Sequence, residues 1–277
     1  MRLVRHAVRS EDERAWNPAS HVIAEPGLDD VDAVVNLAGA GIGDRVWTSR
    51  YRREILTSRV EATRGLAAAL ASAPRRAIPR ILLVPSAVGV YGAEGGEGTF
   101  DESSPVADDF LARVCRLTEA AARGAAEAGV RVVALRTGLV LSHAGGFLAA
   151  QRPLYLAGLG GPIDSGQQWV SWIARSDHVR AMVHLLTDSD LEGPVNLTAP
   201  GPVRQREFAR AFAASLHRPS LIRLPSAPLV PVLGRDMVGE ILRSGQRVLP
   251  SRLLLDGFTF DHPRLAEALD EVRAGRQ

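Results

Sequence analysis

Apolar runs of strand length alternate with helix-like stretches along most of this chain, and this alternation narrows the choice of fold more than any other feature. Strands are expected at residues 1–7, 33–37, 81–85, 132–135 and 195–198, and helices at 48–73, 108–128, 177–186 and 205–216. The second helical stretch repeats apolar residues at three- and four-residue spacing, with Asp108 or Asp109 placed to cap its first turn. Helices between successive strands favour parallel pairing with right-handed crossovers. The sequence therefore predicts an α/β fold with a doubly wound parallel sheet.

The alternation stops near residue 224. The stretch that begins SAPLVPVLGRDMV reads as short helices joined by proline and glycine turns. We therefore expect two parts, a sheet domain over residues 1–223 and a small helical C-terminal subdomain over 224–277.

The residue types exclude several kinds of chemistry. All 33 residues counted as lysine plus arginine are arginine, which removes Schiff-base lysines, the phosphate-loop lysine and any tyrosine-lysine couple. Cys115 is the single cysteine, so an intrachain disulfide and a multi-thiolate zinc site are both excluded. The seven histidines are scattered without the spacing of metal ligands, and no metal site is expected.

Charge and hydropathy bear on the partners. A formal net charge of +2, with acidic residues interspersed throughout, favours an arginine-rich solvated surface over a nucleic-acid-binding one. No apolar run approaches the ~20 residues of a membrane span, and the arginines near the start argue against a signal peptide. We expect a cytoplasmic protein with a small-molecule substrate and neither nucleic acid nor membrane as partner, and we leave open whether it forms oligomers.

Glycine-rich or polar loops follow the expected strands. They span residues 35–47, 85–96, 135–146 and 158–179. In open parallel sheets ligands bind beyond the carboxyl ends of the strands, and glycines let the backbone approach a flat ligand closely. The four loops together predict a binding cleft, whereas each alone could be a tight turn without a ligand.

The motifs of these loops resemble a known family. The segments VNLAGAGIGDRVW, SRVEATRGL, SAVGVYG, ALRTGLVLS, GLGGPIDSGQQWVSWI, GPVNLTAP and SGQRVLPSRLLLDGFTF are similar to the bacterial epimerase-like branch of the extended short-chain dehydrogenase/reductase superfamily, which carries a DUF1731-type C-terminal domain. The resemblance covers nearly the whole chain. It implies a Rossmann-like sheet domain that binds a pyridine dinucleotide.

The start of the chain departs from that family. The resemblance implies a glycine-rich turn after the first strand, where backbone N–H groups hold the dinucleotide pyrophosphate, and no segment here matches it. The opening MRLVRHA resembles the family's second strand instead, so a βα unit of about 25 to 30 residues is expected to be missing. We favour a reading frame that was started too late over a shortened chain or a fold that has closed the gap.

The resemblance also implies the cofactor and its contacts. Arg5 stands where the second strand ends, the place at which an arginine would accommodate the extra phosphate of NADP. NADP is therefore the expected cofactor, although the absence of the glycine-rich turn puts its binding by this chain in question. The expected cofactor-binding residues are Arg5, Leu37, Ala38, Gly39, Ser86, Arg136, Thr137 and Gly138.

The catalytic couple of the superfamily is replaced. Short-chain oxidoreductases usually carry a tyrosine, with lysine four residues later, and by resemblance these positions are Leu111 and Cys115. Leucine has no proton to give, and a thiol with an ordinary pKa near 8.5 is a poor substitute for the ammonium group. The usual proton transfer is therefore not expected.

Other side chains could transfer protons. The main candidates are Tyr91, Ser86 and Asp177, and His178 and Glu102 are further candidates. The alternatives are that Tyr91 packs its turn, that Asp177 caps the following helix, and that Glu102 orders a loop.

Two further residue groups have open interpretations. Arg136 could clamp an anionic substrate or pair with an internal carboxylate. Trp169 and Trp172 could line the substrate side or pack in the core.

Two functions follow from these patterns. The first is an NADP-dependent oxidoreductase or epimerase-like protein acting on an unidentified small molecule. The second is a non-catalytic dinucleotide-binding or regulatory protein, which the missing tyrosine and lysine favour.

Overall fold

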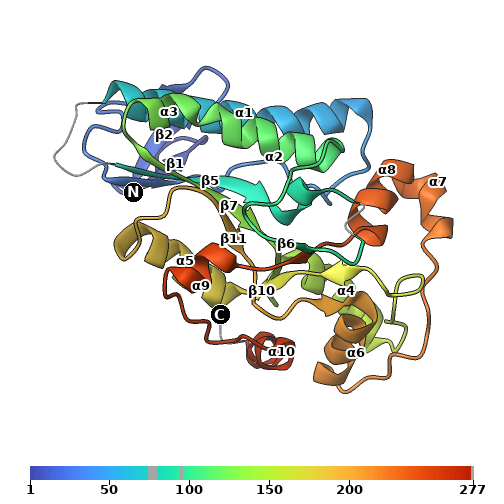
Figure 1. The fold of residues 1–277 in the computed structure, drawn as a ribbon. Helices are drawn as coiled ribbons and strands as arrows, with labels where there is room; N and C mark the ends of the chain where they lie inside the picture. Colours follow the sequence, from blue (N-terminus) through green and yellow to red (C-terminus); the bar gives the residue numbers. More distant parts are fainter. Residues whose placement is uncertain (74–79, 94–95, 276–277) are drawn as a thin grey trace. The chain divides into compact units, whose positions relative to one another are not determined.

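The computed structural model describes residues 1–73, 80–93 and 96–275 of the chain (Figure 1). It divides into two compact units, each formed by two segments. The first unit comprises Met1–Ser86 and Val114–Leu135, and the second comprises Ala87–Arg113 and Arg136–Gln277. Helices and parallel strands are both present, so the expected α/β class is confirmed.

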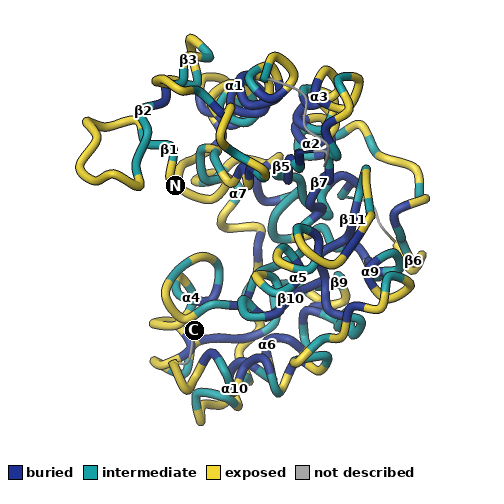
Figure 2. The backbone as a smooth tube through the Cα atoms, turned by 90° about the vertical axis from the view of Figure 1, so that its left-hand side faces the viewer, coloured by how far each residue is buried: buried dark blue, intermediate teal, exposed yellow. Residues whose placement is uncertain are grey.

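The parallel sheet of the first unit is built from β4 (Ala33–Val35), β5 (Ile81–Ala87) and β7 (Arg131–Thr137), in the order β4, β5, β7. Val34 lies opposite Leu82 in the parallel pair of β4 and β5. Leu82, Leu83 and Val84 of β5 have no exposed surface, and Figure 2 shows β5 in the colour of buried residues. A run buried on both faces is what an uninterrupted apolar stretch predicts.

Helices α1 (Ser49–Ser72) and α3 (Arg123–Glu127) pack against each other in this unit. The hydroxyl of Thr48 accepts a hydrogen bond from the Tyr51 N–H at 3.1 Å and so begins α1. Buried residues recur along one face of the helix because apolar side chains three and four positions apart lie on the same side. That face includes Ile55, Ala62, Leu66 and Leu70.

A small three-stranded sheet was not expected. It consists of β1 (Arg2–Val4), β2 (Glu13–Asn17) and β3 (Val22–Ile23), with β1 parallel to β2 and β2 antiparallel to β3. In this sheet β1 is an edge strand, and β4 is an edge strand of the larger sheet. Within the described ranges no strand pairs with both.

The second unit contains β11 (Gly193–Leu197) and three short strand pairs. These pairs are β8 (Leu139–Leu141) with β10 (Trp172–Ala174), β9 (Trp169–Val170) with β12 (Val203–Arg204), and β6 (Thr99–Phe100) with β13 (Arg247–Val248). Its helices include α4 (Gly146–Leu156), α5 (Arg175–Thr187), α6 (Gln205–Ser215), α9 (Ser251–Leu255) and α10 (Leu265–Ala274), with a 3-10 turn at Val88–Tyr91.

The C-terminal segment is part of the second unit. It begins with the short helical turns Ala227–Leu229, α7 (Val230–Leu233), α8 (Arg235–Met237) and Val238–Arg243. Its β13 pairs with β6, and α10 packs against α6. Leu265 and Leu269 of α10 share one core with Trp172, Phe208 and Phe212.

The helices differ from the expectation at two places. The stretch 108–128 is interrupted at Ala122, where the backbone turns, and forms α2 (Phe110–Ala121) and α3. Asp109 accepts the Ala112 N–H at 2.9 Å, as expected for a cap. Helix α4 was not expected, because Gly145, Gly146 and Pro153 favour a loop.

Candidate functional site

The loop between β4 and α1, residues 36–48, is held in place by side chains of α1. The Ala40 N–H donates to the Ser58 hydroxyl at 3.0 Å, and the Tyr51 hydroxyl donates to the Gly41 carbonyl at 2.5 Å. The guanidinium of Arg59 donates to the Ala40 carbonyl at 2.8 Å. These bonds fix the backbone of the β4–α1 loop in advance of any ligand.

Asn36 shapes the start of this loop. Its side chain is buried, donates to the Thr63 hydroxyl at 3.0 Å and accepts the Ala38 N–H at 3.0 Å. The resulting turn leaves Leu37 64% exposed just after the end of β4. Leu37 and Ala38, two of the expected cofactor contacts, therefore lie at the carboxyl end of β4, where α/β proteins bind ligands.

Two glycines of this loop, Gly39 and Gly41, lie directly against side chains of the protein. A Cβ on Gly39 would lie 2.9 Å from two carbon atoms of Arg59, and one on Gly41 would overlap the Asp44 carboxylate. The sequence left open whether these glycines serve the close approach of a flat ligand or a tight turn without one. The side chains of Arg59 and Asp44 occupy the space beside them in the structure.

Ser86 lies at the end of β5 and donates a hydrogen bond to the Glu119 carboxylate of α2 at 2.6 Å. Both residues belong to the first unit, together with the buried Cys115 one turn earlier on α2. The sequence did not identify Glu119 as the partner of this hydroxyl. The roles of Ser86 in cofactor binding and in proton transfer stay predictions, and its hydroxyl is oriented toward Glu119.

Arg5 directly follows β1 and is exposed. Its guanidinium has no hydrogen bond or ion pair among the described residues. This is the position that the resemblance implied, and the side chain is available to an anionic ligand.

Tyr91 of the second unit is buried and hydrogen-bonded. Its hydroxyl donates to the Asn196 side-chain oxygen at 2.7 Å and accepts from Arg136 at 3.2 Å, and its ring contacts Phe100. Burial raises the pKa of the phenol. These contacts agree with the packing alternative for Tyr91, and its catalytic role stays a prediction. Arg136 is equally buried beside it.

Glu102 orders the loop that carries it. Its carboxylate accepts the backbone N–H groups of Asn196 at 3.0 Å and Arg252 at 3.3 Å. This is the loop-ordering role expected for Glu102.

Thr137 and Gly138 lie at the end of β7, within the second unit. The Thr137 hydroxyl is 3.2 Å from Nε2 of His178. A Cβ on Gly138 would lie 2.6 Å from the Ser171 carbonyl oxygen, so only glycine fits there. Burial lowers the pKa of His178 to about 4, which keeps the imidazole neutral at physiological pH.

The burial of His178 makes stability depend on pH. In the unfolded chain His178 takes up a proton near its ordinary pKa of 6.5, whereas in the folded protein it does so only near pH 4. Between these two pH values the unfolded state binds more protons, so the free energy of unfolding falls as the pH falls. From pH 7 to pH 5 wild type is expected to lose about 2 kcal/mol more than His178→Gln in urea unfolding. His143→Gln, which removes an exposed histidine, is expected to behave as wild type. An identical pH dependence in wild type and His178→Gln would contradict this assignment.

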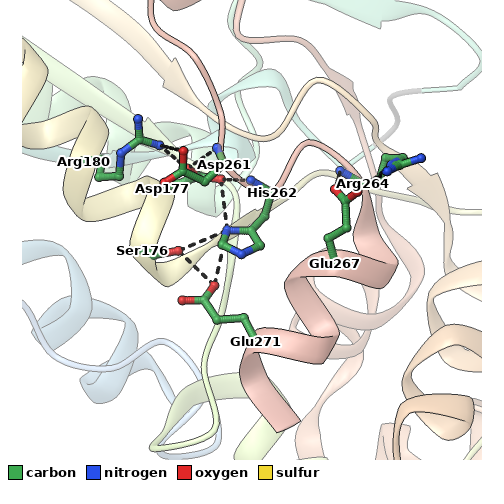
Figure 3. Close-up of polar contacts among 8 residues, drawn as sticks. All are labelled: Ser176, Asp177, Arg180, Asp261, His262, Arg264, Glu267 and Glu271. Atoms are coloured by element: carbon green, nitrogen blue, oxygen red, sulfur yellow. Dashed lines mark hydrogen bonds and ion pairs between the residues drawn. The ribbon is translucent and has the colours of Figure 1, made fainter. Parts of the chain in front are cut away.

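Asp177 joins α5 to the C-terminal segment (Figure 3). Its fully buried carboxylate accepts the N–H groups of Asp261 and His262, each at 2.9 Å, and pairs with Arg180 at 2.9 Å. The helix cap is Ala174, so the capping alternative for Asp177 is wrong. The contacts found are structural, and a catalytic role of Asp177 stays a prediction.

The two tryptophans of the fourth loop have different surroundings. Trp172 is fully buried and donates to the Gly201 carbonyl at 2.9 Å, so it belongs to the core. Trp169 is half-buried, with the Arg204 guanidinium 3.8 Å from its ring centroid.

The predicted cleft itself stays untested. The first loop lies in the first unit and the fourth in the second unit, and Glu94 and Gly95 of the second loop lie outside the described residues. In the described residues no helix is long and apolar enough to cross a membrane. The same residues contain no group of three or more histidine, cysteine, aspartate or glutamate side chains that could hold a metal ion.

A parallel sheet with fixed loops at its carboxyl ends is the architecture of nucleotide-binding α/β proteins. The family model described as "NAD dependent epimerase/dehydratase family" matches residues 20–197, and the model for the domain of unknown function DUF1731 matches 224–272. The chain belongs to this epimerase family.

Similar proteins support the same family. The epimerase family protein Mb2239 of Mycobacterium bovis is 42% identical over 269 residues, covering 97% of this chain and 87% of the relative. The epimerase family protein SDR39U1 of Homo sapiens is 36% identical over 255 residues, covering 91% and 85%.

Solved structures are also similar. The crystal structure of the human SDR39U1 protein (isoform 2) with NADPH has a TM-score of 0.86 and 33% identity, covering 98% of this chain and 90% of that one. A nucleoside-diphosphate sugar epimerase from Corynebacterium glutamicum has a TM-score of 0.78 and 29% identity, covering 99% and 52%.

Proposed function

We propose that this chain is an NADP-dependent oxidoreductase or epimerase-like protein that acts on a small molecule. The observation that carries the proposal is the similarity to the human SDR39U1 structure with NADPH, at 33% identity over 98% of this chain. The β4–α1 loop fits such a cofactor, because its backbone is fixed by α1 and Leu37 is exposed at the carboxyl end of β4. Bound NADPH would supply a hydride to the substrate.

The test is binding of NADPH to the chain itself. Thermal unfolding with and without NADPH is expected to show a rise in Tm that grows with NADPH concentration. The same Tm at every NADPH concentration would reject dinucleotide binding by this chain.

Arg5 is proposed to set the preference for NADP over NAD. In fluorescence titrations, Arg5→Glu is expected to weaken NADPH binding by about tenfold or more, because a carboxylate would face the 2′-phosphate, with NADH binding little changed. Arg9→Glu makes the same charge change at another exposed arginine of the N-terminal segment and is the control. Equal weakening of NADPH and NADH by Arg5→Glu would reject this role.

The substrate class to test first is nucleotide-linked sugars, because the similar structure from Corynebacterium glutamicum is that of a nucleoside-diphosphate sugar epimerase. A panel of such sugars, assayed for NADPH oxidation and for epimer formation, examines the catalytic proposal.

A second function, non-catalytic dinucleotide binding, is favoured by the state of the candidate acids and bases. The Tyr91 hydroxyl is hydrogen-bonded to Asn196, and the Ser86 hydroxyl is hydrogen-bonded to Glu119. By resemblance, leucine and cysteine stand at the positions of the catalytic couple. NADPH binding without turnover of any substrate in the panel would favour this function.

A further inference from the structure

Arg59 has an unusual position on α1. Both contacts of its guanidinium are made through Nη1, to the Ala40 carbonyl at 2.8 Å and the Ile55 carbonyl at 3.1 Å. The side chain lies across Gly39, where a Cβ would be 2.9 Å from its Cγ and Cζ atoms and 3.1 Å from Nε. Arg59 therefore lies against the backbone of the β4–α1 loop.

The charge of Arg59 is not compensated by the part of the chain that the structure describes. No carboxylate forms an ion pair with it there, and its Nε and Nη2 make no hydrogen bond to the described residues. Burial lowers the pKa of the guanidinium, while the nearby Cys115 thiol and Tyr51 phenol act in the opposite direction. A cation that has lost water without gaining an anion is costly to a fold, which indicates that an anion is supplied from outside.

The open edge of Arg59 has a defined chemistry. Nε and Nη2 lie on one side of the planar guanidinium, and this fork matches two oxygens of a phosphate or carboxylate. Holding the Ala40 carbonyl uses Nη1 alone, so the loop contact does not account for the open edge.

We propose that Arg59 binds a pair of anionic oxygens of a ligand at the β4–α1 loop, either a phosphate of the dinucleotide or an acidic group of the substrate. This inference rests on the proposed function for the identity of the ligand. The anion-binding chemistry rests on Arg59 itself, and the two can therefore fail separately.

The experiment compares three variants with wild type. Arg59→Gln removes the charge and the fork, Arg59→Lys keeps the charge without the fork, and Arg53→Gln changes an exposed arginine on the same helix as a control. Each is titrated with NADPH, and the rise in Tm caused by inorganic pyrophosphate is measured without dinucleotide. The Tm without any ligand reports whether a variant is folded. If Arg59→Gln is unfolded, the comparison of Arg59→Lys with wild type tests the inference.

A dinucleotide phosphate at Arg59 predicts that NADPH binding weakens by about tenfold or more in Arg59→Gln, less in Arg59→Lys, and not in Arg53→Gln. Unchanged NADPH binding with loss of the pyrophosphate effect in Arg59→Gln assigns the anion to the substrate. Wild type that responds to pyrophosphate through Arg59 and not to NADPH would support the inference while rejecting the proposed function. The inference is overturned if Arg59→Gln and Arg59→Lys match wild type with both probes, or if neither probe affects wild type.

Discussion

Replacing Asp177 by alanine is expected to lower the free energy of unfolding by about 3 kcal/mol, because a fully buried carboxylate that accepts two backbone N–H groups and pairs with the half-exposed Arg180 is removed. The N–H groups of Asp261 and His262 both lose their acceptor, and Arg180 loses one of two carboxylate partners. Urea unfolding at pH 7 measures the loss. The C-terminal segment is expected to detach first, since Asp177 ties it to α5.

Two companion variants make this prediction specific. Asp177→Asn keeps one acceptor oxygen and is expected to lose less than Asp177→Ala. Asp261→Asn alters a neighbouring, mostly exposed carboxylate and is expected to change stability by about 0.5 kcal/mol or less. A loss below about 1 kcal/mol in Asp177→Ala would show that the buried carboxylate does not hold the segment.

Gly161→Ala is expected to destabilise the second unit by about 3 kcal/mol or more, at the upper end of overpacking effects. A Cβ at Gly161 would overlap the carbonyl oxygen of Ile222, which is backbone and cannot rotate away. Moving the backbone of residues 221–224 would break the hydrogen bonds between Leu224 and Pro162, at 2.8 Å, and between Leu224 and Asp164, at 2.9 Å. Differential scanning calorimetry of the two proteins gives the comparison.

Gly239→Ala is the matched control, because nothing lies within 4 Å of a Cβ there and the residue is in a helical turn. Its Tm is expected to equal or slightly exceed that of wild type. Similar Tm values for Gly161→Ala and wild type would mean that the 221–224 segment yields easily.

The strand β5 could be predicted because burial on both faces requires an uninterrupted run of apolar residues, which is visible in the local sequence. The run ILLVP is apolar regardless of what surrounds it, and the structure places β5 over it. Helix α1 is marked by the Thr48 cap and by its apolar period. By contrast, β2 and β3 carry mixed residues, and α4 begins at two glycines and contains Pro153, so local preference indicated loops.

The candidate site was only partly predictable. Leu37, Ala38 and Gly39 lie at the strand end where the sequence placed them, since a loop is located by the strand before it. Arg59 was missed, because nothing within SRVEATRGL tells that this arginine lies against Gly39 and pairs with no carboxylate of the described residues. The hydrogen bonds of Tyr91 to Asn196, of Ser86 to Glu119 and of Asp177 to the C-terminal segment were also missed, since these partners are distant along the chain.

The sequence alone determined the fold class, the order of the main strands and helices, and the family, because these depend on residue patterns that are local or shared with relatives. The tertiary structure alone decided which polar side chains find a hydrogen-bond partner within the described part of the protein. Hydrogen bonds and burial join residues far apart in the chain, so the roles of Gly39, Tyr91 and Asp177 follow from their neighbours in space.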